Sequence, residues 1–358
     1  MSQLFVNNFS FEQALNPGYQ PSRTVARFEN ELACAWLAVA EADDQILCSA
    51  TISDADREAL AERTGTRAEL ITPQQIPATK ITQIIPWGWT PAVRKLASQL
   101  GVTISVPLQD AIRRVNSRQF STEVSQQLGC ALPGECVVNS LPELMPSIQR
   151  IHQQFGKWII KPNLSQAGRG QLRGDSPYLS ESQLATLLHL LSGNGVVVVE
   201  PLLDSVAELG WQWEIHSDGR QELHGIARLL TDEQGRYVGS HVNSIEIRTQ
   251  QMENLECLHR EVLQRIFSAG YFGPVGIDTM IYREGNTQRI RPLQEINARW
   301  TMGRLALAWG KRFHSSGKWL HSQVAPNQNS TLLSPDRLDG EQVGHRTWWR
   351  PDDSEAVS

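Results

Sequence analysis

The chain has 358 residues, more than the roughly 250 to 300 at which a single hydrophobic core stops growing, so two or three compact units are expected. A hydrophobic fraction of 40% and eleven tryptophans argue against intrinsic disorder. The net charge of −5 includes no long single-sign run, which gives no reason to expect nucleic acid or an anionic membrane as a partner and favours a small molecule.

The cysteines and the N-terminal segment bear on the compartment. None of the cysteines forms a C-x-x-C pair or a zinc-like spacing with nearby histidines, so they are expected to be reduced thiols, many of them in the core. The start of the chain lacks a basic region and a continuous apolar stretch, and nowhere do about 18 apolar residues follow one another. These features predict a soluble, cytoplasmic protein.

Helical and strand signals alternate over the first part of the chain. Apolar residues near helical spacing predict a helix over 23–42, and an N-cap serine with a terminal glycine predicts another over 53–65. Two further segments, 80–89 and 101–107, are typical of strands. Between the last two, a threonine, a proline and a terminal glycine mark a further helix. The order strand, helix, strand predicts a small α/β domain with a mainly parallel sheet.

The pattern changes after a helical stretch over residues 108–129. Strand-like segments now pair through short turns, 157–163 with 170–174 and 211–217 with 220–230, and another follows at 236–242. A helix is predicted over 251–268, two strands over 273–283 and 287–297, and a last helix over 301–313. This part is α+β, and from about residue 330 the polar composition predicts a loosely held tail.

Polar side chains alternate along the second strand of the predicted hairpin. Glu295 and Asn297 point to the same face of an extended chain. If the hairpin is centred between Asn286 and Thr287, Asp278 on the first strand lies opposite Glu295. Two carboxylates and a carboxamide oxygen are hard ligands of the kind that Mg²⁺ takes alongside phosphate oxygens and water. An ordinary solvated strand face carries the same spacing, so spacing alone leaves both interpretations open.

A loop of small residues follows a predicted apolar strand in the segment WIIKPNLSQAGRGQ. Lys161 ends the strand, and Ser165, Gly168 and Gly170 come after it. Small residues let backbone N–H groups approach a polyphosphate. The segment is neither a P-loop nor a dinucleotide fingerprint, because no Gly-Lys-Ser/Thr follows and the next element is a strand. A glycine hairpin turn beside a surface lysine is the alternative interpretation.

A run of four valines leads directly into Glu200 and a proline, with further acids at Asp204 and Glu208. A buried strand that ends on an acid and a proline suits the lining of an adenine slot, and an acid a few residues later suits the ribose hydroxyls. A strand that simply ends at the surface explains the pattern equally well.

Taken together, the order and spacing of these segments resemble the ATP-grasp superfamily. The motifs run from residue 158 to residue 303 and are, in chain order, WIIKPN with AGRG, VVVVEP, GIDTM and QEINAR. The α/β unit before them resembles the domain that normally precedes the grasp. The resemblance implies an α/β plus α+β fold, in which an N-terminal pre-ATP-grasp α/β domain is followed by a two-lobed ATP-grasp domain.

The boundaries expected from this resemblance are residues 1–110 for the α/β domain and 111–330 for the ATP-grasp domain. Within the latter, the small lobe is expected at 130–200 and the large lobe at 201–330. Residues 331–358 form the polar C-terminal tail.

The resemblance also implies roles for the phosphate and metal residues. It assigns Mg²⁺ on the ATP phosphates, with Mn²⁺ as an alternative, to Asp278, Glu295 and Asn297. Lys161 would contact phosphate, and the loop 165–170, with Ser165, Gly168 and Gly170, would close over it.

Adenine and ribose contacts are implied by the resemblance at the end of the valine strand. Glu200 and Leu202 would bracket adenine. Glu208, with Asp204 as a second choice, would hold the ribose.

Two positions depart from the pattern of the family. The segment VNSR replaces an Asn-x-Lys segment with a second phosphate lysine, so Arg118 would have to substitute for that lysine. Gly276 replaces an arginine of the dipeptide ligases, which moves the stabilisation of the electrophile to Arg299. A simple ion pair with a surface acid is the alternative interpretation of Arg299.

The function implied is that of an ATP-dependent carboxylate–amine ligase. It would form an amide or peptide bond through an acyl phosphate and release ADP and phosphate, with charge and positioning supplied by Mg²⁺, Lys161 and Arg299. The expected partners are small-molecule carboxylate and amine substrates, without nucleic acid or membrane, and a homodimer is compatible with this function. A small-molecule kinase that uses the same ATP site and a nucleotide-binding module without catalysis are the alternatives.

Overall fold

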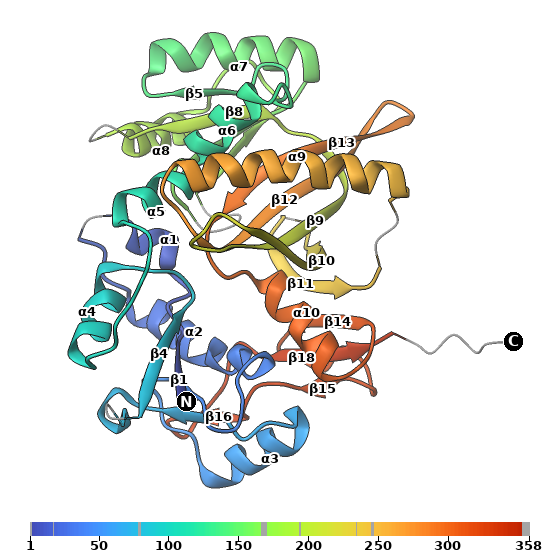
Figure 1. Ribbon diagram of the computed structural model, residues 1–358. Helices are drawn as coiled ribbons and strands as arrows, with labels where there is room; N and C mark the ends of the chain where they lie inside the picture. Colours follow the sequence, from blue (N-terminus) through green and yellow to red (C-terminus); the bar gives the residue numbers. More distant parts are fainter. Residues whose placement is uncertain are drawn as a thin grey trace, which may run out of the picture. The chain divides into compact units, whose positions relative to one another are not determined.

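The computed structural model describes residues 2–16, 18–77, 80–165, 170–192, 195–233, 235–244 and 247–352 (Figure 1). The chain divides into two compact units, and each is described by itself. Unit 1 comprises Met1–Gln109, Leu223–Glu246 and Arg299–Ser358, and unit 2 comprises Asp110–Glu222 and Ile247–Ala298. The domain boundaries that the resemblance implies stay predictions.

A four-stranded parallel sheet forms the N-terminal part of unit 1. Its strands lie in the order β3 (Glu69–Ile71), β2 (Gln45–Leu47), β1 (Ser2–Val6) and β4 (Ile81–Pro86). The main helices are α2 (Arg23–Leu32), α3 (Asp54–Thr64) and α4 (Pro91–Gln99). Each of the three begins at a serine or threonine whose side chain accepts a backbone N–H, as capping requires. The predicted α/β architecture is confirmed.

Three strands of this sheet were not predicted from the sequence, and one predicted strand does not form. β1 has five residues and β2 and β3 have three each, which is too short for alternation to be visible. Residues 102–107 form no strand. Their apolar side chains pack instead, since Val102 and Ile104 lie against the core cluster that includes Leu4.

The later segments of unit 1 add an antiparallel group of strands. Their order is β10 (Gln221–Thr231, of which the first two residues belong to unit 2), β11 (Tyr237–Val242), β14 (Gly317–His321), β18 (Thr347–Pro351) and β15 (Thr331–Leu332). Helix α10 (Met302–Arg312) contacts β11 and β14. The remaining short elements are α1 (Phe11–Ala14), η1 (Ala33–Ala38), η2 (Pro73–Gln75), β16 (Arg337–Leu338) and β17 (Glu341–Gln342).

The C-terminal segment differs from the loosely held tail that its polar composition predicts. β18 pairs with both β14 and β15, and Trp349 is buried. The Trp348 indole donates a hydrogen bond to the Ser322 carbonyl over 2.9 Å. The two tryptophans supply enough apolar area to hold the strand despite its polar neighbours. Residues 353–358 lie outside the described part of the chain.

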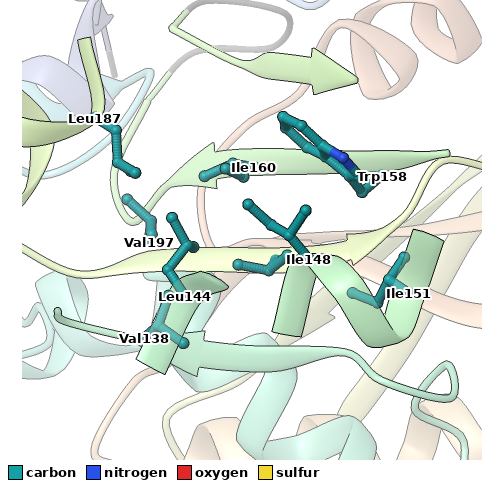
Figure 2. Packing of buried hydrophobic residues seen from close by; sticks show 9 residues of the cluster. Val138, Leu144, Ile148, Ile151, Trp158, Ile160, Leu187 and Val197 are labelled. Carbon is teal, nitrogen blue, oxygen red and sulfur yellow. The ribbon is translucent and has the colours of Figure 1, made fainter. Parts of the chain in front are cut away.

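The first part of unit 2 is a four-stranded antiparallel sheet with two helices. The strands lie in the order β5 (Cys136–Val138), β8 (Val197–Pro201), β6 (Trp158–Pro162) and β7 (Leu172–Gly174), and the helices are α7 (Leu141–Phe155) and α8 (Glu181–Leu191). Leu144 and Ile148 of α7 and Leu187 of α8 pack onto Trp158 and Val197 of the sheet (Figure 2). The predicted pairing of 157–163 with 170–174 is therefore confirmed by β6 and β7.

The helical stretch predicted over residues 108–129 is two helices, α5 (Gln109–Val115) and α6 (Arg118–Gln127). The break falls at Asn116 and Ser117. The Ser117 hydroxyl accepts the N–H of Phe120 and so begins α6 as an N-cap, a role that competes with continuing the helix.

The second part of unit 2 consists of three long antiparallel strands and one helix. β13 (Thr287–Asn297) pairs with β12 (Gly273–Glu284), which pairs with β9 (Asp204–Ile215). Helix α9 (Thr249–Ser268) lies against these strands (Figure 1). It buries the face that includes His259 and Val262. No helix in the described part of the chain is both long and apolar enough to cross a membrane.

Candidate functional site

Asp278 and Glu295 lie directly opposite each other on β12 and β13. This register was predicted from the sequence and is confirmed. The turn of the hairpin differs from the prediction, because it lies at Gly285 and Asn286, one position earlier than expected. The register of the two strands then shifts between Asp278 and Met280. The shift compensates for the earlier turn.

The three predicted metal residues lie together at the end of the hairpin. The Asn297 side-chain amide donates a hydrogen bond to Asp278 Oδ2 over 3.0 Å. Glu295 is about a quarter exposed at 24% of its side-chain surface, so solvent can reach its carboxylate. Carboxylate and amide oxygens fit Mg²⁺, which completes its shell with phosphate oxygens and water. Among the described residues, no group of three or more histidine, cysteine or acidic side chains could hold a metal ion.

Arg118 connects Glu295 to the loop after β6. Its Nη2 lies 2.8 Å from Glu295 Oε1, and its Nη1 donates to Ser165 Oγ and to the Pro162 carbonyl over 2.8 and 2.6 Å. The residue is buried, at 5% exposure, at the start of α6. The structure therefore brings one predicted metal ligand, the predicted phosphate arginine and the first residue of the predicted phosphate loop into one hydrogen-bonded group.

Lys161 and Glu200 form a buried ion pair between neighbouring strands. Lys161 Nζ lies 2.5 Å from Glu200 Oε1, and the two residues are 8% and 4% exposed. Arg291 of β13 binds both oxygens of the same carboxylate over 3.0 and 2.8 Å, and its Nη2 also reaches Glu135 over 3.0 Å. The result is a buried chain of four alternating charges, which stabilises only if every member keeps its partner.

The charges of this chain set the protonation of Glu200. Burial alone would raise its pKa, but the positive charges of Arg291 and Lys161 outweigh burial and hold the pKa of Glu200 well below its ordinary value. The carboxylate is thus ionised at neutral pH. Arg291 and Glu135 were not singled out from the sequence, where an arginine in a strand gives no sign that it is buried.

The predicted ribose residue shares the electrostatic environment of Lys161. The pKa of Glu208 lies above its ordinary value. Burial is the main cause and the negative charge of Glu295 adds to it, whereas the positive charge of Lys161 opposes it. The Ser205 hydroxyl lies 3.5 Å from the Glu208 carboxylate. Asp204, the alternative to Glu208 for the ribose, is exposed at the start of β9, where it lies opposite Arg283 of β12.

The remaining predicted contacts are placed only in part. The Leu202 N–H donates to the Lys157 carbonyl over 3.1 Å, which ties the segment after β8 to the start of β6. Gly170 has a φ of +70° and Pro162 is 3.1 Å from where its Cβ would lie, so a larger residue would be strained there. Gly168 lies outside the described residues.

Arg299 belongs to unit 1 and makes its described contacts there. Its Nε pairs with the carboxylate of the buried Glu12, its Nη1 donates to the Trp300 carbonyl over 2.8 Å, and its guanidinium lies over the Trp87 ring at 5.5 Å. The interpretation of Arg299 as part of a simple ion pair expected a surface acid, whereas its partner Glu12 is buried. The proposed role of Arg299 on the reacting phosphate stays a prediction.

No family model and no curated protein sequence matches the chain. Solved structures do match it over most of its length. N5-carboxyaminoimidazole synthetase from Staphylococcus aureus, complexed with ADP, has a TM-score of 0.55 and 12% identity and covers 98% of this chain and 93% of its own. The biotin carboxylase domain of Hydrogenobacter thermophilus 2-oxoglutarate carboxylase, with MgADP and bicarbonate, has a TM-score of 0.55 and 14% identity over 98% and 86%.

A third match is D-alanyl-alanine synthetase A from Vibrio cholerae, with a TM-score of 0.54 and 12% identity over 88% of this chain and 93% of that one. Identities at this level show a shared fold and leave the reaction open.

Proposed function

Because the chain has the ATP-grasp fold, with a parallel α/β domain ahead of it, we propose that it is an ATP-dependent enzyme that joins a carboxylate to an amine. In this proposal ATP phosphorylates the carboxylate, and the amine then displaces phosphate from the acyl phosphate. The products are an amide or peptide, ADP and phosphate.

The observation that carries the proposal is the position of Glu295. It faces Asp278 across the hairpin and pairs with Arg118, which also holds Ser165 of the loop after Lys161. Metal ligands and a phosphate loop need to be close when one cation bridges phosphate oxygens during transfer. The similar structures solved with ADP or MgADP support the same assignment.

Asp278, Glu295 and Asn297 would hold Mg²⁺, with Mn²⁺ as a substitute. The cation would neutralise charge on the transferring phosphoryl group. The protein's own contribution is positioning: Arg118 binds both the Glu295 carboxylate and the Ser165 hydroxyl, and the Asn297 amide holds one oxygen of Asp278.

Lys161 is proposed to supply the positive charge on phosphate. It can move from Glu200 toward a phosphate without leaving a lone buried carboxylate, because Arg291 binds both Glu200 oxygens independently. Glu208 would bind the ribose, and the backbone around Glu200 and Leu202 would line the adenine. We propose that these contacts act by orientation and charge, without a nucleophilic side chain.

The experiment that tests the proposal measures ADP release over a panel of small acids combined with amino acids and other amines, with product masses. Bicarbonate belongs in the panel because the Hydrogenobacter structure contains it. A condensed product that is heavier than either substrate alone, formed together with one ADP, supports the ligase. A stable phosphorylated product supports a kinase instead, a carboxylated product a carboxylase, and ATP binding without turnover a non-catalytic module.

The partners follow from the proposed reaction. They are a small carboxylate, a small amine and Mg-ATP. A homodimer remains part of the proposal, supported by the Hydrogenobacter domain, which was solved as a dimer.

A further inference from the structure

The hairpin of β12 and β13 contains a bulge that decides which residue faces Asp278. Next to the turn the pairing is regular, with Glu284 opposite Thr287 and Met280 opposite Arg291. If that register continued for two more residues, Leu293 would lie opposite Asp278. The structure places Glu295 there, so β13 carries two more residues than β12 across the bulge.

Pro292 is the first residue of β13 after the regular pairing ends. Proline has no N–H and cannot donate to a strand ladder, so the regular register is interrupted at this position. Its carbonyl oxygen accepts two side-chain hydrogen bonds, from the Thr279 hydroxyl and from His259 Nε2, each over 2.9 Å. Both donors are fully buried at 0% exposure. The Pro292 carbonyl thus accepts hydrogen bonds from two buried side chains.

The two donors come from different elements. Thr279 follows Asp278 on β12, and His259 lies on α9, where its ring meets the Trp211 ring of β9 edge-on at 4.7 Å. Burial lowers the pKa of His259 to about 4, so the ring is neutral at physiological pH and has one N–H. Its Nδ1 is buried without a hydrogen-bond partner among the described residues, which is consistent with the proton on Nε2.

We infer that Thr279 and His259 are positioning residues for the proposed metal site, because their hydrogen bonds to the Pro292 carbonyl fix the bulge that sets Glu295 opposite Asp278. Neither side chain is proposed to touch the metal or the substrate. The inference rests on the proposed function, since it concerns the residues assigned to Mg²⁺.

The test measures Mn²⁺ binding by electron paramagnetic resonance in the presence of an unhydrolysable ATP analogue. Thr279→Val and His259→Leu each remove one donor and keep a similar volume. Either change should weaken Mn²⁺ binding by about 10-fold or more, the range found when partners behind metal ligands are removed. The affinity for the analogue without metal should change by less than about two-fold, because the predicted nucleotide contacts are left in place.

Conservative variants and a matched control separate positioning from general loss of stability. Thr279→Ser and His259→Gln keep a donor and should retain most of the affinity for Mn²⁺. Thr64→Val removes another buried hydroxyl, which donates to the Leu60 carbonyl in unit 1, and should leave Mn²⁺ binding unchanged. If His259→Leu does not fold, as judged by circular dichroism, Thr279→Val decides.

The outcomes test the positioning role separately from the proposed metal site. If Glu295→Gln abolishes Mn²⁺ binding but Thr279→Val binds as well as the wild type, the positioning role is wrong and the metal site stands. If the wild type and Glu295→Gln bind Mn²⁺ equally, the proposed metal site is wrong and the inference falls with it.

Discussion

Arg291 shows how much a single buried side chain can organise. It binds both oxygens of Glu200 and one of Glu135, and through Glu200 it is connected to Lys161. From the sequence, Lys161 and Glu200 were assigned separately to phosphate and adenine. The structure joins them into one charge chain, while their contacts with a nucleotide stay predictions.

Replacing Arg291 should therefore destabilise unit 2 strongly. Arg291→Met removes the cation that Glu135 and Glu200 share, leaves Glu200 with Lys161 alone, and should cost about 3 to 5 kcal/mol in the free energy of unfolding. Arg289→Met, two positions earlier on the same strand, breaks only an exposed pair with Glu284 and should cost no more than about 1 kcal/mol. Urea unfolding of both variants makes the comparison, and equal losses would show that the buried chain adds nothing special.

A second substitution tests Arg299. Arg299→Lys keeps the charge but loses the planar fork that binds a phosphate through two parallel N–H bonds. It should lower kcat more than it weakens ATP binding, because the contact matters most after the phosphoryl group has moved. Arg312→Lys in α10, whose arginine donates to backbone carbonyls of unit 1, is the control. Unaltered kcat and kcat/KM in Arg299→Lys would leave the pair with Glu12 as a purely structural contact.

At the scale of elements, long periodic segments were predictable and short ones were not. The hairpin of β12 and β13 was visible in the sequence because each strand offers eleven or twelve positions. β1 to β3 were not, since their pairing depends on neighbours distant in the chain. The bulge at Pro292 was also out of reach, because it depends on partners from β12 and α9 that only the fold brings together.

The loop 165–170 carries a prediction at this scale. If it closes over phosphate, trypsin should cut after Arg169 more slowly when Mg²⁺ and an unhydrolysable ATP analogue are present, because bound ligand orders a glycine-rich segment. The Glu295→Gln variant should gain much less protection under the same conditions. Equal cleavage rates with and without ligand in the wild type would remove the loop from the site.

For the whole molecule, the sequence predicted two or three compact units, and the structure divides into two. Unit 1 takes in residues 223–246 and 299–358 as well as the N-terminal sheet. The buried strand β18 belongs to this unit, although its surroundings in the sequence are polar. Local composition does not report such long-range pairing, because the partners of β18 are chosen by the fold.

Buried histidines in both units make the stability depend on pH. Burial lowers the pKa of His259 to about 4, and it lowers the pKa values of His321 and His345 below the ordinary 6.5. His321 Nδ1 and His345 Nε2 lie 2.8 Å apart. Since the unfolded chain binds these protons first, the contribution is complete above pH 6.5 and is lost as the pH falls toward 4.

Urea unfolding between pH 7.5 and pH 5 checks this dependence. The free energy of unfolding should fall with decreasing pH by up to about 1.4 kcal/mol per pH unit for each such histidine. A His345→Gln variant should show a shallower slope. A free energy that stays constant or rises from pH 6.5 to pH 5 would contradict the assignment of these side chains as neutral.

The central claim, that ATP activates a carboxylate as an acyl phosphate, is tested most directly by following oxygen. With an acid from the panel that supports ADP release, labelled with ¹⁸O in its carboxylate, mass spectrometry of the released phosphate measures the transfer. The proposed reaction predicts one ¹⁸O in each phosphate formed, because the carboxylate oxygen that receives the phosphoryl group leaves with it. Phosphate that carries no label, released together with ADP and an amide product, would contradict the claim.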